Sequence, residues 1–170
     1  MRKSGFWAAY MLLLLAQLLL SNFFNLTPYL MLSILPVMVL CIPIRMGTTG
    51  AMLIAFATGV VVDLLSEGLI GLNAAALVPV AFLRNSIIKL VFGTELFARG
   101  EDFSPRRNGL GKTVLATVLA QALFTLIYIW VDDASTSPFW FDAARFGISL
   151  VAGTVLALAC LPSLAPDPRK

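Results

Sequence analysis

The segment from Phe56 to Arg84 constrains the fold more than any other part of the chain, because two apolar runs meet there at a short polar turn. The first run ends GVVVDLLSEG and the second begins LIGLNAAA, a pattern typical of a transmembrane helical hairpin. Asp63 and Asn73 lie at similar distances from the turn, so two helical arms would hold them at similar depth. A charged group at the centre of a membrane helix costs about 2.5–3.5 kcal/mol, so Asp63 needs a role.

The composition of the whole chain excludes a water-soluble domain. Hydrophobic residues make up 59% of the chain and charged residues 12%, with a mean hydropathy of +0.92, which leaves too little polar surface to cover a globule. The chain has no histidine, and its two cysteines are far apart, so metal, haem and Cys–His sites lack their usual ligands. We therefore predict an integral membrane protein that is not an enzyme and holds no metal or cofactor.

The hydropathy pattern predicts an all-α bundle of six transmembrane helices in a single domain, residues 1–170, with spans at about residues 6–24, 29–42, 48–66, 69–92, 113–131 and 139–161. The first run is longer than a signal peptide core and no small-residue cleavage site follows it, which favours an uncleaved span. Pro36 lies inside the second span and predicts a kink there. Residues 162–170 are polar and rich in proline, which predicts a disordered cytoplasmic tail.

The basic residues predict the orientation. With a cytoplasmic N-terminus, all of the 12 Lys and Arg residues except Arg145 fall on the cytoplasmic side, so both termini should face the cytoplasm. The formal net charge of +3 thus reflects topology, and we predict no nucleic-acid partner. The GLGKT sequence at residues 109–113 departs from the phosphate-binding loop pattern, because Arg106 stands where that pattern needs glycine.

Asp63 admits three interpretations: a proton relay, an ion ligand, or a structural carboxylate that pairs with Asn73 and Arg145 where three helices meet. The structural interpretation is favoured, because a transporter needs several convergent polar groups within the membrane, and here Gln17 and Gln121 stand singly on apolar helices. Arg84 lies about 15 residues from the turn, roughly 22 Å along a helix, so it should snorkel toward the cytoplasmic surface.

Small residues indicate close packing between the third and fourth spans. Gly59 and Gly71 lie in these spans together with three consecutive alanines at residues 74–76, and all of them let two helix backbones approach. Ordinary bundle packing explains this pattern more simply than a dedicated face for a partner protein.

The hairpin resembles a known family. GVVVDLLSEGLIGLNA is similar to the signature segment of the MreD family of rod-shape-determining membrane proteins, in which a glycine, three apolar residues, an aspartate, a turn and a Gly-Leu pair recur. The NLTPYL sequence before the second span, Arg45 after it, and the Phe-Leu-Arg that ends at Arg84 are similar as well. The likeness covers the length, the number of spans and motifs over residues 25–84. Beyond Phe92 only the hydropathy agrees.

This resemblance implies a non-catalytic scaffold of the bacterial cell-wall elongation machinery, located in the inner membrane. It implies association with a bitopic MreC-like protein and, through it, with the MreB filament and the RodA and class B transpeptidase pair that makes peptidoglycan. The alternative is a substrate-binding membrane subunit of an energy-coupling-factor vitamin transporter, which shares the span pattern. Such subunits carry an AxxxA motif in the first span, whereas here Ala8 and Ala9 are followed four residues later by Leu12 and Leu13.

Overall fold

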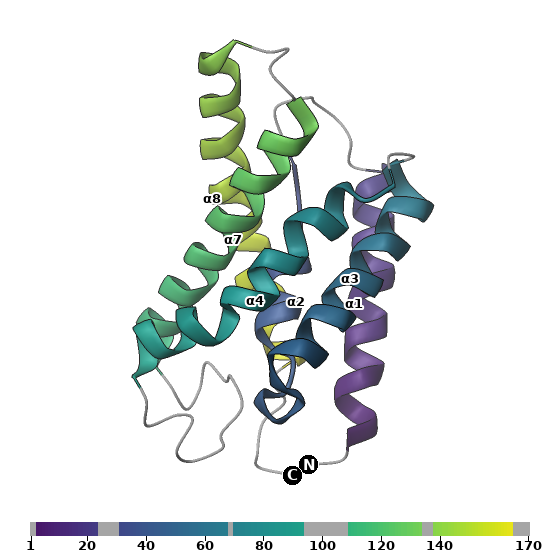
Figure 1. Cartoon of the computed structure of the whole chain (residues 1–170), viewed down its shortest axis with the longest axis vertical. Coiled ribbons are helices and arrows are strands. Elements are labelled where there is room, and N and C mark those ends of the chain that lie inside the picture. Colours follow the sequence, from purple (N-terminus) through teal and green to yellow (C-terminus); the bar gives the residue numbers. More distant parts are fainter. Residues whose placement is uncertain (1–2, 24–30, 68–69, 94–108, 134–137, 165–170) are drawn as a thin grey trace.

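The chain folds into a bundle of α-helices without strands in its described part, which comprises residues 3–23, 31–67, 70–93, 109–133 and 138–164 of a computed structural model (Figure 1). The elements in chain order are α1 (Lys3–Phe23), α2 (Leu35–Leu40), the 3-10 turn η1 (Ile44–Met46), α3 (Gly47–Val62), the π-helical turn η2 (Asp63–Glu67), α4 (Leu72–Phe92), α7 (Leu110–Asp133) and α8 (Phe139–Leu164). The predicted all-α class is therefore confirmed.

Five helical stretches in the described ranges are long and apolar enough to cross a membrane. They are Gly5–Asn22, Ile44–Ser66, Leu72–Phe92, Leu110–Asp132 and Phe139–Pro162, and they overlap the first and the last four predicted spans. Their lengths of 18 to 24 residues correspond to about 27–36 Å at 1.5 Å per residue, close to the ~30 Å hydrocarbon layer. The chain is a multi-pass membrane protein.

The second predicted span, residues 29–42, differs from the structure. Residues 29–30 lie outside the described part, residues 31–34 are not helical, and α2 has only 6 residues. Proline explains both limits of α2. Pro36 stands in its first turn, where a missing N–H costs nothing, and so starts the helix instead of kinking it. Pro43 disfavours helical geometry at the residue before it and so ends the helix.

Residues 31–42, which we call the central segment, occupy the middle of the bundle. Figure 1 shows them running inside the other helices, from the end of the molecule where α1 stops to the end where α3 begins. From Ser33 to Ile42 every residue is buried, and Leu35, Val37, Met38, Val39 and Leu40 are fully buried at 0% exposure. A backbone that is not helical is tolerated at membrane depth only where protein surrounds it, as it does from Ser33 onward.

The remaining helices wrap this segment. α4 packs against α3 on one side and α7 on the other, and α7 packs against α8. Helix α1 lies along α3 at the outside of the bundle, where the buried Tyr10 hydroxyl hydrogen-bonds the Thr58 hydroxyl at 2.9 Å (Figure 1). The beginning of α1 and the end of α8 lie at the same end of the molecule (Figure 1). The chain therefore passes between the two ends an even number of times. Residues 165–170, most of the predicted disordered tail, are outside the described part.

Candidate functional site

The buried carboxylate of Asp63 lies at the junction of α3 and α4. Asp63 is 0% exposed, and η2 begins at this residue. One carboxylate oxygen accepts hydrogen bonds from the Asn73 backbone N–H at 2.9 Å and from the Asn73 side-chain amide at 3.0 Å. The other oxygen accepts from the backbone N–H groups of Gly71 at 2.9 Å and Ala74 at 3.3 Å. Four donors thus converge on one side chain.

Three of these donors are backbone N–H groups at the start of α4. The first turn of a helix has N–H groups without helical acceptors, and the helix dipole makes this end positive. Asp63 supplies both the acceptors and the negative charge from the preceding helix. Gly71 makes this geometry possible, because its φ of +104° turns the chain back into α4 and strains any residue with a side chain. The hairpin is therefore closed by a cap that reaches from one arm to the other.

Close contact between the two arms holds this cap in place. A Cβ atom added at Gly59 would lie only 2.4 Å from the Cα atom of Ala74. Since Ala74 also donates to Asp63, backbone approach and capping occur at the same level of the hairpin. Of the residues singled out in the sequence, the structure brings Gly59, Asp63, Gly71 and Asn73 together here.

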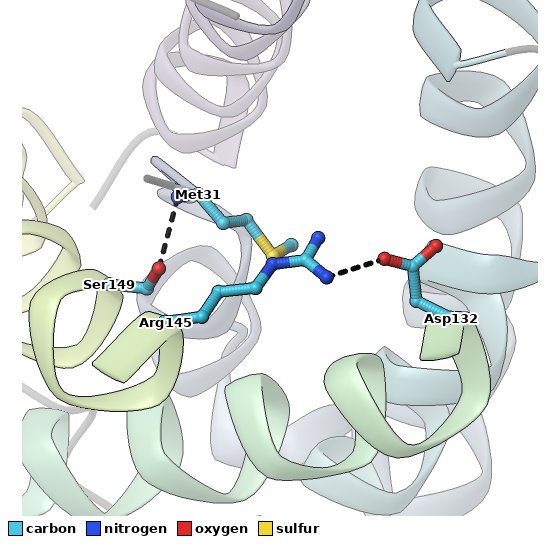
Figure 2. Close-up of polar contacts among 4 residues, drawn as sticks. All are labelled: Met31, Asp132, Arg145 and Ser149. Carbon is cyan, nitrogen blue, oxygen red and sulfur yellow. Dashed lines mark hydrogen bonds and ion pairs between the residues drawn. The ribbon is translucent and has the colours of Figure 1, made fainter. Parts of the chain in front are cut away.

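Arg145 does not join this group. Its guanidinium pairs with the Asp132 carboxylate at 2.8 Å, which links α8 to the end of α7. Figure 2 shows the Arg145 side chain reaching past Met31 toward Asp132, while the Ser149 hydroxyl faces the Met31 amide. That amide donates to the Ser149 oxygen at 3.0 Å. The structure thus pairs Arg145 with Asp132 at the end of α7, and not with Asp63 as expected.

Arg84 also departs from expectation. It is 1% exposed, so its charge stays inside the bundle instead of snorkelling to a surface, and one of its terminal nitrogens donates to the carbonyl oxygen of Ile42 at 2.8 Å. Ile42 lies just beyond the end of α2, where backbone carbonyl groups have no N–H donor within the helix. Arg84 therefore binds the end of the central segment that leads into η1.

Gln17 performs the corresponding task at the other end of the central segment. Its amide nitrogen donates to the Leu32 carbonyl at 3.2 Å, and its amide oxygen accepts from the Ile34 N–H at 2.8 Å. The same nitrogen also donates to the Ser21 hydroxyl at 3.1 Å. Residues 31–34 are not helical, although the Ile34 carbonyl accepts from the Met38 N–H at 3.3 Å, so an amide side chain with both a donor and an acceptor suits their other backbone groups. Sequence reasoning missed this role, although a lone glutamine on an apolar helix was its signal.

Helices α1, α4 and α8 together supply the polar groups that satisfy the central segment, through Gln17, Arg84 and Ser149. These contacts, like those of Asp63, join side chains to the protein's own backbone. Gln121 on α7 differs from them, because its buried amide oxygen has no hydrogen-bond partner among the described residues.

Within the described ranges, no three His, Cys, Asp or Glu side chains are grouped so that they could hold a metal ion. The hydrogen bonds of Asp63, Gln17 and Arg84 fix how the helices and the central segment pack. No protein-family model, curated protein or solved structure matches this chain.

Proposed function

We propose that this protein is a non-catalytic scaffold of the bacterial cell-wall elongation machinery, acting in the inner membrane. The proposal starts from the resemblance of residues 25–84 to the MreD family. Its partner would be a bitopic MreC-like protein, which would connect it to the MreB filament and to the RodA and class B transpeptidase pair. The described helices, long enough to cross a membrane, suit a protein that assembles others within the bilayer.

One observation supports a structural role best. The Asp63 carboxylate, the most conspicuous charge in the signature hairpin, accepts four hydrogen bonds from residues of that hairpin. A proton relay or ion site needs a carboxylate that can exchange partners, and a carboxylate with four fixed donors is poorly suited to that task. The hairpin signature is therefore explained by folding, which leaves the outer surfaces of the helices for partner proteins.

The test is depletion of the protein in a rod-shaped host, together with purification in mild detergent. We expect loss of rod shape, unchanged vitamin uptake, and co-purification of a bitopic MreC-like protein. Normal cell shape after complete depletion would contradict the proposal.

The alternative is a substrate-binding subunit of a vitamin transporter, and one feature favours it. Transporters often build their binding sites from interrupted helices at the bilayer midplane. The central segment is such an interruption, and Gln121 adds a buried amide oxygen without a partner in the described part. Native mass spectrometry of the purified protein separates the two functions: a stoichiometric bound vitamin would favour transport, and its absence after expression in vitamin-rich medium would favour the scaffold.

A further inference from the structure

Three large aromatic side chains stand exposed at one end of the bundle, where α7 stops and α8 begins (top of Figure 1). Trp130 is 80% exposed, Phe139 79% and Trp140 83%. These values are among the highest for any large apolar side chain in the described ranges. Exposed tryptophan at such a density requires an environment that accepts an apolar ring with a polar N–H group.

Each tryptophan lies next to exposed apolar residues on the same face of its helix. On α8 the exposed positions Trp140, Ala144, Ile148, Val151 and Val155 follow one another at intervals of three or four residues, which places them on one face. On α7 Leu126 is exposed one turn before Trp130. In a membrane protein such aliphatic stripes face the lipid chains, so the tryptophans occupy the positions where the lipid-facing surface reaches the end of the bundle.

The length of α7 between its exposed lysine and its exposed tryptophan can be compared with the thickness of a bilayer. Lys112 is exposed in the first turn of α7, 18 residues before Trp130. That separation is about 27 Å along the helix. The hydrocarbon layer is about 30 Å thick, and lysine and tryptophan are the residues that mark its two boundaries. The ammonium group of Lys112 and the indole ring of Trp130 are thus separated along α7 by about the thickness of the hydrocarbon layer.

The charged side chains of Asp132 and Arg145, which lie near the tryptophans, are less exposed than the aromatic rings. Asp132 and Arg145 pair with each other, and their side chains are only 24% and 16% exposed. This ion pair thus lies mostly inside the bundle, whereas the three aromatic rings of the same end lie outside it. A water-facing tip would be expected to show the reverse arrangement.

We propose that Trp130, Phe139 and Trp140 form an aromatic belt that binds the headgroup region of the phospholipid leaflet at the α7–α8 end and fixes the depth of the bundle. The rings would lie at the boundary between the acyl chains and the headgroups, with the indole N–H groups directed to ester and phosphate oxygens. This assignment does not depend on the proposed function, because a scaffold and a transporter both need a fixed depth.

Fluorescence quenching by brominated phospholipids tests the belt. The chain has three tryptophans, so the double variants Trp7→Phe/Trp130→Phe and Trp7→Phe/Trp140→Phe each keep one reporter. They would be reconstituted in phosphatidylcholine vesicles brominated either near the glycerol or near the methyl end of the chains. We expect both reporters to be quenched several-fold more strongly by shallow than by deep bromines, and to be protected from aqueous iodide.

Leu126→Trp in a background where all three tryptophans are Phe provides the matched control. Position 126 lies on the same exposed stripe, four residues or about 6 Å deeper than Trp130. Its quenching maximum should shift toward the deep bromines. If Trp130 and Trp140 are instead quenched by iodide and by neither lipid, the belt is wrong and this end faces water or a protein. Equal quenching of positions 126 and 130 by the deep bromines would also overturn it.

Discussion

The buried carboxylate of Asp63 closes the α3–α4 hairpin through four hydrogen bonds. Because each of its oxygens accepts two hydrogen bonds, no neutral side chain of the same size can replace it fully. The sequence placed Asp63 and Asn73 at matching depth, and the structure brings them together. The backbone donors were not predictable in the same way, since their positions depend on the path of the turn through Gly71.

Asp63→Asn should lower the free energy of unfolding in detergent by about 1–3 kcal/mol, because the new amide group has only one acceptor oxygen and leaves buried N–H groups unsatisfied. Asp63→Leu removes both acceptors and should cost more. Asp132→Asn is the control: it weakens a single ion pair that is partly exposed, so it should cost less than Asp63→Asn, which disturbs four hydrogen bonds of a fully buried group. If Asp63→Asn abolished activity in cells while stability and partner binding stayed normal, a proton- or ion-coupled role would replace the structural one.

Gln17 and Gln121 form a second comparison. Both are almost fully buried, at 3% and 1% exposure, but Gln17 satisfies the central segment whereas the Gln121 oxygen has no partner in the described part. Methionine has nearly the shape of glutamine without its hydrogen bonds. Gln17→Met should therefore reduce stability by about 1–3 kcal/mol, and Gln121→Met should be neutral or stabilising. Equal losses in thermal unfolding experiments would show that Gln121 has a partner of its own.

At the scale of the elements, the α3–α4 hairpin depends on one absent side chain. Gly59→Ala places a methyl group 2.4 Å from the backbone of Ala74, so the arms must separate, and overpacking of this kind costs about 1–3 kcal/mol. Gly147→Ala on α8 is the matched control, because its new Cβ atom would meet nothing within 4 Å. The control should be neutral or slightly stabilising through its helix propensity. Comparable melting temperatures for the two variants would contradict the close approach.

The sequence predicted the long helices well and the central segment poorly, for a physical reason. Hydropathy measures how apolar a stretch is, but it cannot tell a lipid-facing helix from a segment such as residues 33–42, which is apolar because protein surrounds it. Pro36 and Pro43 contained the missing information, since together they leave room for only a short helix. The acceptor of Arg84 could not be inferred, because it depends on how this segment threads the bundle, and the partner of Arg145 depends on how α7 packs against α8.

The whole molecule has five long helices in its described part, yet α1 begins and α8 ends on the same side. The central segment accounts for the difference by returning the chain from one end to the other. Together with the basic residues, this arrangement leads us to expect that reporters fused after Lys170 or within residues 94–108 are cytoplasmic and that a reporter within residues 134–137 is external. Paired phosphatase and fluorescent-protein fusions measure this, and an external reporter after Lys170 would refute it.

The hydrogen bond between Met31 and Ser149 has a consequence for biosynthesis. Its two residues are 118 positions apart, so at 5–20 residues per second the ribosome finishes the acceptor about 6–24 s after the donor. Throughout that interval the backbone of residues 31–34 has its α1 partner, Gln17, but not its α8 partner. Backbone that is not helical and lacks a hydrogen-bond partner is unstable in lipid. We therefore expect the central segment to remain at the membrane surface or in the insertion machinery until translation has delivered the last helix.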